Sequence, residues 1–530
     1  MHDHDHAHEA AGRRRRHWAS GIGLTMALAL ALSAPAMAEE LVIAIPDEFP
    51  TLAAPWGYQA QTALVLRNVH EPLLDRDPAT GNLIPGLATN WEQIDDTTWR
   101  FHLREGVTFH DGSPFNAEAA AFSINDTYSA ENRNDPVYAP ISTRAAIPFE
   151  AVVVDDYTID IVSEQLKPLL LGHIFTAGIS SMEQLTERPE TFGDTPIGTG
   201  AWKFVSWDRG AGYTLERNPD WWGLDSEDIE HTPDFDRVQF LIRPEVSSRI
   251  AAVRAGEADF AWDLPAEECA SQLGDNCVEG PSPIVSYVRI DTPHPTLGDP
   301  RIREALAISI DRDGIGQALL GGAPPASQLD VMGALGFIED LEPFPYDPDR
   351  ARELIQEAEA DGVDTSLTVS LLGRRASFAG DELVLEVLQA GWTDLGFDIS
   401  ADMMESAAYN AIFVGGSDTY EEGRAALFLL RWPNDLFDAG RTVQSHLFCP
   451  GGVNIECQPE LEARAREAMS LPDAEREVAM QELLRDFNKD MNHLMFIPLN
   501  ELRIFHGVGD RVDWAPRQDM WLYAREFQRR

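Results

Sequence analysis

The sequence is poor in positive charge and has almost no lysine. It holds 41 Lys and Arg against 88 Asp and Glu among 530 residues, which gives a formal net charge of −47. The three lysines are Lys167, Lys203 and Lys489. Such an acidic chain argues against nucleic acid and against anionic membrane surfaces as partners. It suits a saline habitat, where salt screens carboxylate repulsion, although a GC-rich genome also explains the preference for arginine.

The start of the chain lacks a hydrophobic run long enough to span a bilayer. The basic segment Arg13–Arg16 precedes the apolar segment Gly21–Leu32, which is too short to cross a membrane. Residues 36–38 read Ala-Met-Ala, an A-x-A cleavage site before Glu39. This pattern predicts a signal peptide over 1–38, with the general export route favoured over the twin-arginine route. Because no cysteine follows the site, we expect a mature periplasmic protein that is freely soluble and not embedded in the membrane.

Cysteine is scarce as well. The four cysteines form two local pairs, Cys269/Cys277 and Cys449/Cys457, each eight residues apart. In an exported protein this spacing predicts two disulfide bonds, each closing a small loop. Zinc is the alternative, but a C-x7-C spacing without a neighbouring histidine is poor for a zinc site.

Recognisable catalytic motifs are missing too. The chain contains no G-x-S-x-G, H-E-x-x-H or C-x-x-C motif. The pair His70-Glu71 is followed by Pro72, which interrupts a helix and prevents a histidine pair four residues apart. Close carboxylates arise by chance among 88 acidic residues and carry little information. We therefore expect no catalysis, no cofactor and no metal ion.

The most informative stretch of the chain is 83–124. Trp99, Phe101 and Leu103 alternate with polar residues, which predicts a strand with one apolar face. Turn residues follow, and Asn116 is placed to cap a helix that starts at Ala117. Local physics alone thus predicts a strand, a turn and a capped helix, and says nothing about function.

The order and spacing of these residues resemble the signature of the family 5 extracellular solute-binding proteins, the oligopeptide, dipeptide and nickel receptors of ABC importers. The family pattern reads approximately Y-x-F-x-L-R-E-G-V-K-F-H-D-G-x-P-x-x-A-E-D-V-x-F-S, and this chain follows it from Trp99 to Ser123. Further segments resemble the family in the family's order, so the resemblance covers nearly the whole mature chain. They are Asn68–Leu74, Pro196–Phe204, Glu216–Gly223, Asp299–Arg312 and Ile497–Leu499.

The resemblance implies an α/β, two-lobed periplasmic binding protein (Venus flytrap) fold with an additional subdomain on the first lobe. The implied first lobe comprises 39–75, 195–288 and 503–530, the subdomain 76–194, and the second lobe 289–502. We also expect helices near 348–360, 379–395 and 459–490.

The implied function is that of a periplasmic receptor that binds a peptide or similar amine-bearing solute between its lobes. The receptor would act as a monomer and deliver the solute to the permease subunits of an ABC importer. A metal chelate, an opine, glutathione or an oligosaccharide remain alternative solutes, because one fold supports many ligands. A secreted hydrolase is the alternative from another class.

The resemblance also suggests an anchor for the ligand's amine. Peptide-binding members of the family often place an Asp of a W-x-x-D segment against the peptide α-ammonium, and Trp432 to Asp435 has this spacing. Asp435 is therefore the first candidate, and Asp438 on the same loop is a weaker one. The alternative is an ordinary solvated Asp in a turn that follows a strand.

Other candidates follow from the same comparison with the family. Arg374 and Arg375 follow an apolar strand, where dipeptide receptors carry an Arg that holds the ligand's carboxylate. Trp56, Tyr409 and Trp432 are candidates for lining hydrated side-chain pockets. A solvated surface role for the arginines and core packing for the aromatic residues are the alternatives.

Overall fold

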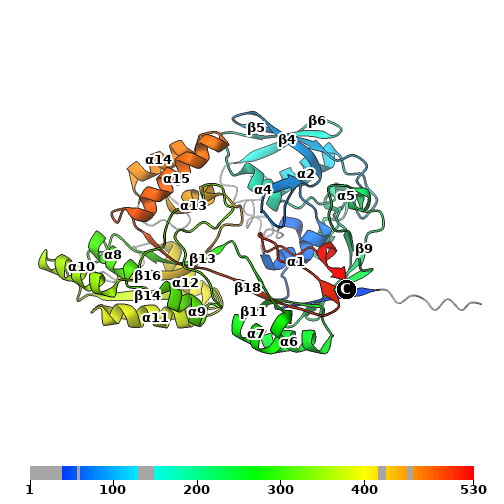
Figure 1. Ribbon diagram of the computed structural model, residues 1–530. Helices are drawn as coiled ribbons and strands as arrows, with labels where there is room; N and C mark the ends of the chain where they lie inside the picture. Colours follow the sequence, from blue (N-terminus) through cyan, green and yellow to red (C-terminus); the bar gives the residue numbers. More distant parts are fainter. Residues whose placement is uncertain (1–38, 56–59, 129–147, 416–424, 450–456) are drawn as a thin grey trace, which may run out of the picture. The chain divides into compact units, whose positions relative to one another are not determined.

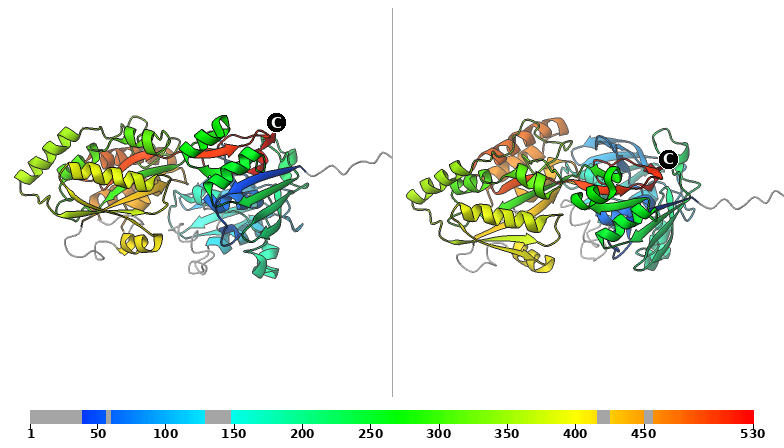
Figure 2. Two further views of the ribbon diagram at one scale, coloured as in Figure 1. Left: turned by 90° about the horizontal axis from the view of Figure 1, so that it is seen from below. Right: turned by 60° about the horizontal axis from the view of Figure 1, so that its bottom comes forward.

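The computed structural model describes residues 39–530 except 56–59, 129–147, 416–424 and 450–456. Residues 1–38 lie outside the described part, so the signal peptide and its cleavage site stay predictions. Within that part, three sheets of four or more strands carry the fold, and helices pack around them (Figures 1 and 2).

The first sheet has seven strands in the order β12-β18-β11-β1-β10-β9-β8. Strand β1 pairs in parallel with β10 on one side and β11 on the other, which explains why its run Leu41–Ile45 is almost continuously apolar. Helix α1 packs on one face, and α6 and α7 pack on the other. The strands are β1 (Glu40–Ile45), β8 (Trp202–Asp208), β9 (Gly212–Arg217), β10 (Arg237–Ile242), β11 (Phe260–Leu264), β12 (Cys277–Gly280) and β18 (Ile504–Val508), and the helices are α1 (Ala60–Val69), α6 (Val246–Ala255) and α7 (Ala266–Leu273).

The second sheet has five strands in the order β15-β14-β16-β13-β17. Helices α8 to α11 cover one face, where they build a large apolar core, and α12 to α15 cover the other. Figure 1 shows α8, α10 and α11 beside β14, and α6 and α7 beside β11 of the first sheet. The strands are β13 (Ile284–Ile290), β14 (Thr368–Arg374), β15 (Asp398–Met404), β16 (Ala425–Pro433) and β17 (Phe496–Glu501). The helices are α8 (Pro300–Ile308), α9 (Arg312–Leu319), α10 (Pro348–Ala360), α11 (Asp381–Asp394), α12 (Ser406–Gly415), α13 (Ala439–His446), α14 (Pro459–Met469) and α15 (Asp473–Lys489).

Capping residues set several of these helix starts. Asp347 accepts a hydrogen bond from the backbone N–H of Arg350 and is followed by a proline at the first helical position, so α10 begins where the sequence predicts. The helix expected near 379–395 is α11. The segment expected to be helical over 459–490 is two helices, because Pro472 cannot continue the hydrogen-bonding pattern of α14.

The third sheet has four antiparallel strands in the order β4-β5-β7-β6. The strand predicted around Phe101 is β5, and Phe101 is fully buried as its alternation indicates. Asn116 Oδ1 accepts from the N–H of Ala119, which confirms the predicted cap of α2. The elements of this region are β2 (Leu74–Arg76) and β3 (Leu83–Pro85), which form a hairpin, β4 (Ala88–Asp95), β5 (Thr98–Leu103), α2 (Ala117–Tyr128), β6 (Phe149–Asp155), β7 (Thr158–Ser163), α4 (Leu170–Thr176) and α5 (Met182–Glu187). Strands β19 (Val512–Asp513) and β20 (Gln528–Arg529) pair near the C-terminus.

The chain passes between the first and second sheets at two places. Residues 281–283 join β12 to β13, and residues 502–503 join β17 to β18. The expected division into lobes at 288 and 502 stays a prediction. All of β13 pairs with β16 and β17 from Ile284 onward, which argues for a first boundary before residue 284.

Candidate functional site

A cavity of about 1070 Å³ lies between the first and second sheets. One wall comes from the residues that follow β1 and from β11 and α7 of the first sheet. The other comes from the end of α9, the β14–α11 connection and Arg431 of β16. Residues 502–503, where the chain passes between the sheets, also line it. The cavity thus lies beyond the carboxyl ends of parallel strands, where α/β proteins commonly bind ligands.

Strained backbone gathers around this cavity. In the described part, four non-glycine residues have a positive φ: Asp263 (50°), Ala376 (56°), Phe437 (52°) and Met520 (62°). Asp263, Ala376 and Met520 line the cavity, and Phe437 lines a second one of about 500 Å³. Such conformations are unfavourable for residues with a Cβ and persist where the surrounding structure imposes them, often at functional sites.

Charges of opposite sign without an ion-pair partner among the described residues face the cavity from its two walls, and Asp47, Glu267 and Glu268 line the first wall together with Asp263. Asp263 at the end of β11 is exposed to it, and Arg431 on β16 is half-buried. Among the described residues, neither side chain forms a hydrogen bond or an ion pair within 4.0 Å. Surrounding protein raises the pKa of Asp263, and the charges of Arg249 and Arg431 oppose that rise. Burial and the like charge of Arg374 lower the pKa of Arg431, and the charges of Asp263 and Asp381 counteract that.

Arg374 and Arg375, the two arginines predicted to hold a carboxylate of the ligand, lie close to this cavity, but only one of them lines it. Arg375 lines it and is exposed, and its guanidinium already pairs with Glu382 and, at 3.2 Å, with Glu405. Arg374 ends β14, is half-buried and does not line the cavity. Of the two, only Arg375 is placed to meet a solute in this cavity, and acidic neighbours partly neutralise its charge.

Asp435 is not the exposed loop residue that its place after a strand suggests. Its side chain is 20% exposed and pairs with Arg441 of α13, with 3.0 Å between Oδ1 and Nε. The charge of Asp435 also acts on Arg76 of β2. Asp435 therefore sits between arginines from two parts of the molecule, and no cavity described above includes it.

Asp438 lines the second cavity and also makes contacts that support the fold. Its Oδ1 accepts from the N–H of Gly440 and so caps α13. Both carboxylate oxygens also bind one nitrogen of Arg476, at 2.9 and 2.8 Å, and the Arg476 side chain is 3% exposed. A buried guanidinium and a helix start thus depend on this carboxylate.

The predicted aromatic lining residues belong to the core where they are described. Trp432 is 7% exposed, and its Nε1 donates to Thr442 Oγ1 at 2.9 Å. Tyr409 is 1% exposed and packs between Phe413 and Phe428. Neither lines a described cavity, and both pack in core clusters of the second sheet. Trp56 lies outside the described residues.

A direct contact joins the β2–β3 hairpin to the loop that follows Asp435. Arg76 donates to the carbonyl of Leu436 at 2.7 Å and to that of Gly81 at 2.6 Å, and its guanidinium lies over the ring of Phe437. Gly81 lies so close to Phe437 that an added Cβ would come within 3.3 Å of the ring. The hairpin thus holds the segment that carries Asp435.

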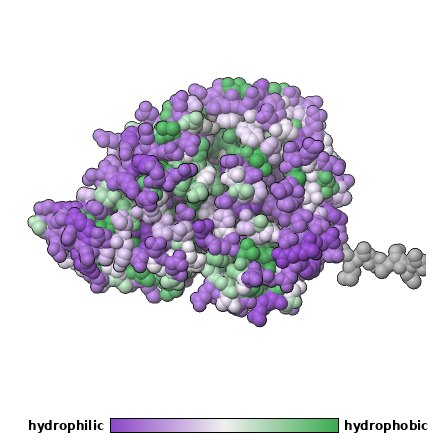
Figure 3. All heavy atoms as spheres, viewed as in Figure 1, coloured by the Kyte–Doolittle hydropathy of each residue, from purple (hydrophilic) through white to green (hydrophobic). Residues whose placement is uncertain are grey.

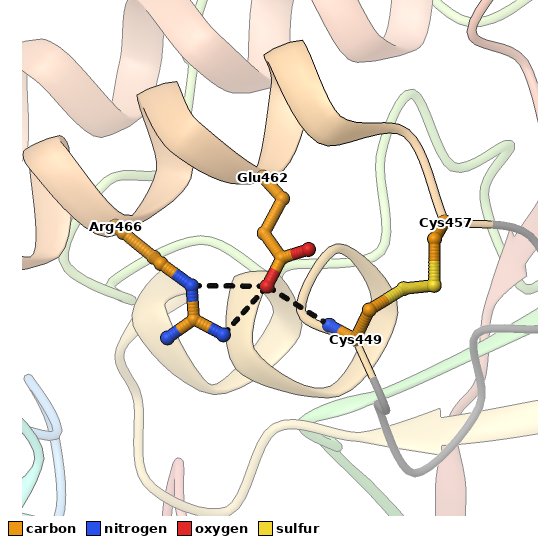
Figure 4. Close-up of a disulfide and its surroundings, with 4 residues drawn as sticks. All are labelled: Cys449, Cys457, Glu462 and Arg466. Atoms are coloured by element: carbon orange, nitrogen blue, oxygen red, sulfur yellow. Dashed lines mark hydrogen bonds and ion pairs between the residues drawn. A yellow bond between two sulfur atoms is a disulfide. The ribbon is translucent and has the colours of Figure 1, made fainter.

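Both predicted disulfides are confirmed. Cys269 bonds to Cys277 and Cys449 to Cys457, with Cα–Cα distances of 5.4 and 5.7 Å. Figure 4 shows how the second bond is tied to α14: Glu462 Oε1 accepts from the backbone N–H of Cys449 at 3.2 Å and from Arg466 Nε at 2.9 Å.

The surface, the donor sets and the helices add three observations. Hydrophilic residues cover most of the face in Figure 3, and apolar residues form small patches on it. In the described ranges, no three His, Cys, Asp or Glu side chains gather in a way that could hold a metal ion. None of the helices there combines the length and the apolar character needed to cross a bilayer.

Comparison with known proteins identifies the family. The model of the bacterial extracellular solute-binding proteins, family 5 Middle, matches residues 82–454, well over half of the chain. The chain belongs to this family. It is 27% identical over 412 residues to the glutathione-binding protein GsiB of Salmonella typhi, covering 75% of this chain and 76% of that protein.

Solved structures show the same fold. HbpA2 from Haemophilus parasuis has a TM-score of 0.77 at 21% identity and covers 93% of this chain and 100% of its own. The dipeptide binding protein from Pseudoalteromonas sp. SM9913, in complex with Met-Leu, has a TM-score of 0.74 at 19% identity with the same coverage. This family 5 solute-binding protein therefore has the predicted α/β, two-lobed binding-protein fold.

Arg431 and Asp263 are the residues that the sequence did not single out. Arg431 directly precedes the W-x-x-D segment and ends a buried apolar run, which is a usable signal. Asp263 resembles any polar residue after a strand. Only the packing of the two sheets brings these two charges to one cavity.

Proposed function

We propose that this protein is the solute receptor of an ABC importer and binds a peptide, or a similar amine-bearing solute, between its two lobes. The observation that carries the proposal is the 1070 Å³ cavity between the first and second sheets, which has an unpaired charge on each wall. The names of related proteins, a glutathione-binding and a dipeptide-binding protein, support a peptide-like solute. Glutathione itself carries an amine and carboxylates.

Binding and delivery would be coupled through closure of the lobes. The lobes move about residues 281–283 and 502–503, and a solute that contacts both walls stabilises the closed form. The permease subunits then receive the solute from the closed receptor. The receptor works in the periplasm as a monomer, needs no cofactor and performs no chemistry.

Asp435 is the proposed anchor for the solute's cationic group. A carboxylate has about four acceptor positions and can pair with more than one cation, of which Arg441 is one here. In this arrangement Arg441 orients the carboxylate, and the ammonium replaces water that is lost on closure.

Native mass spectrometry of the protein purified from a periplasm tests the proposal. We expect a retained peptide or a small amine-bearing solute that denaturation releases. A protein that carries no solute and binds nothing from a peptide library would contradict the proposal. Incubation with the same library distinguishes the receptor from a secreted hydrolase, because a receptor returns the peptides intact.

A further inference from the structure

We propose that the disulfide Cys269–Cys277 stabilises the hinge between the first and second sheets and thereby sets how tightly the closed form holds its solute. The hinge comprises residues 281–283 and 502–503, where the chain passes between the two sheets. This inference rests on the proposed function and deepens it. Breaking this bond should weaken solute binding, whereas breaking the disulfide Cys449–Cys457 should not.

The two parts of the hinge leave the first sheet side by side. Residues 281–283 follow β12, and residues 502–503 precede β18. Strands β12 and β18 are antiparallel, and Gly280, the last residue of β12, pairs with Ile504, the first residue of β18. Both parts of the hinge therefore depend on this one pair of strands for their position at the first sheet.

Strand β12 is held less firmly than β18. It has four residues, lies at the edge of the seven-stranded sheet and pairs with β18 alone, whereas β18 also pairs with β11. In the described part of the chain, the side chains of β12 form one ion pair, with 3.5 Å between Glu279 Oε1 and Arg503 Nε. Solvent screens this pair, because the side chain of Glu279 is 54% exposed. A short edge strand of this kind opens locally unless another contact holds it.

The disulfide holds the end of β12 that lies away from the hinge. Cys277 begins β12, and its partner Cys269 lies on α7, where it is fully buried. Cys269 belongs to an apolar cluster with residues of β1, α6 and β11. Its Sγ also lies 3.6 Å from the carbonyl oxygen of His506 on β18. The bond thus ties the edge strand to the core of the first sheet.

Helix α7 connects this bond to the cavity of about 1070 Å³. Four residues of α7 line that cavity, namely Ala266, Glu267, Glu268 and Ala270. Both parts of the hinge line it as well, through Ser282, Leu502 and Arg503. A movement of α7 relative to β12 therefore changes a wall of the cavity and the hinge together, and the disulfide opposes that movement.

Reduction of the bond should lower the affinity for the solute. A dithiol breaks the S–S bond and supplies two electrons and two protons, so two thiols form and the dithiol becomes a disulfide itself. With β12 released, the closed form competes with more open arrangements of the lobes. The apparent affinity falls in proportion to the fraction of molecules that can close on the solute.

The disulfide Cys449–Cys457 provides a matched control. Its cysteines are also eight residues apart, so loop closure in the unfolded chain contributes about equally to both bonds. Figure 4 shows this bond beside α14, and neither of its cysteines lines a cavity described above. Removing either bond should lower the melting temperature by a similar amount, and only the loss of Cys269–Cys277 should lower the affinity.

The test compares the double variants Cys269→Ala/Cys277→Ala and Cys449→Ala/Cys457→Ala with the parent protein. The probe is a mixture of synthetic dipeptides to pentapeptides. Native mass spectrometry finds the peptide that the parent retains best, and calorimetry measures its affinity. We expect the first variant to bind this peptide about three- to tenfold more weakly and the second to bind it as tightly as the parent. Backbone amides of 277–283 and 502–505 should exchange hydrogen faster in the first variant only.

A reversible form of the test leaves the buried Cys269 in place. In Cys449→Ala/Cys457→Ala, the bond Cys269–Cys277 is the one disulfide left, because the chain has four cysteines. Cys277 is partly exposed, so dithiothreitol can reach the bond in the folded protein. Alkylation and mass spectrometry count the thiols. The affinity should fall on reduction and return on reoxidation.

The outcomes separate the two proposals. If the parent protein retains no peptide, the proposed function fails and this inference fails with it. If the parent binds a peptide and Cys269→Ala/Cys277→Ala binds it equally tightly, the receptor proposal stands and the role given to this disulfide is wrong. Equal weakening in both double variants would overturn that role too, because the effect would then follow from lost stability and not from the hinge.

Discussion

The two ends of the segment Arg431–Asp438 carry charge in different settings. At the carboxyl end, Asp435 pairs with Arg441, and Asp438 pairs with Arg476 and caps α13. At the amino end, Arg431 faces a cavity without an ion-pair partner among the described residues. A matched charge stabilises the fold whether or not a solute is present. An unpaired charge in a cavity is the place where a bound solute of opposite charge adds the most stabilisation.

The largest expected effect concerns Asp438. Asp438→Ala removes both contacts that this carboxylate makes with the buried Arg476 and removes the cap of α13, so we expect the free energy of unfolding to fall by about 3–5 kcal/mol. Urea unfolding followed by circular dichroism measures the change. The matched control is Asp340→Ala, which breaks the exposed pair with Arg485 and should change stability far less, because solvent screens an exposed pair. Equal losses in the two variants would show that the buried pair contributes no more than an exposed one.

The next prediction tests whether Asp435, which already pairs with Arg441, can also bind the solute's ammonium. If Asp435 anchors the solute's ammonium, Asp435→Asn should weaken binding by about 2–5 kcal/mol, or about 30-fold or more, because a buried ammonium loses its counter-charge. Calorimetry with the solute identified by native mass spectrometry gives the answer. Stability should fall as well, by about 1–3 kcal/mol, because Arg441 loses one charged partner. If the variant binds as tightly as the parent, the anchor is misassigned and a neutral solute such as an oligosaccharide becomes the better candidate.

The sequence predicted features that depend on neighbouring residues. The cap at Asn116, the alternation around Phe101 and both disulfides need only short spacings, and the structure has all of them. The family motifs predicted the two-lobed fold, because their order along the chain is itself a strong pattern. The family motifs do not place the lobe boundary to the residue, because the boundary expected at residue 288 falls inside β13, which pairs with β16.

The candidate site was harder to predict because its properties depend on residues far apart in the chain. Whether Asp435 is matched depends on Arg441 and on the burial of both side chains. Whether Arg375 is available depends on Glu382 and Glu405, which the fold brings beside it. Motif spacing places an acid or an arginine near a cleft, but it does not state which charges are already neutralised.

A third prediction concerns Asp330, a buried acid that accepts a hydrogen bond from the segment Arg431–Asp438. Asp330 Oδ1 accepts from Asn434 and Thr442 at 2.6 Å each, and burial raises the pKa of Asp330 to about 6. Because this pKa lies above the unfolded value of about 3.8, the stabilisation from protonated Asp330 is fully present below that value and is lost as pH rises through about 6. Asp330→Asn does not titrate. Relative to the parent, the variant should therefore lose up to about 3 kcal/mol more stability at pH 4 than at pH 7.5.

Urea unfolding of both proteins at the two pH values measures this double difference, in which the titration of all other groups cancels. A difference between variant and parent that does not change with pH would show that Asp330 ionises as freely in the folded protein as in the unfolded chain. It would also mean that burial beside the segment Arg431–Asp438 does not change the pKa of Asp330.

The smallest expected effect concerns Arg76, which connects the segment to the β2–β3 hairpin. Its hydrogen bond to the carbonyl of Leu436 joins the β2–β3 hairpin to the segment Arg431–Asp438. If the proposed opening of the lobes separates these parts, this bond stabilises the closed form and should strengthen solute binding. Arg76→Gln should weaken binding by about tenfold, since a charge-assisted hydrogen bond contributes about 1.5–3 kcal/mol and glutamine retains part of it. Small-angle scattering should show a smaller change in radius of gyration when solute is added. The matched control is Arg104→Gln: Arg104 donates to the carbonyl of Gly86 and pairs with Asp228, both of which belong to the expected first lobe and its subdomain, so affinity should not change. Equal affinity in Arg76→Gln and the parent would mean that the segment holds its position without the hairpin, and that closure depends on the charges in the cavity alone.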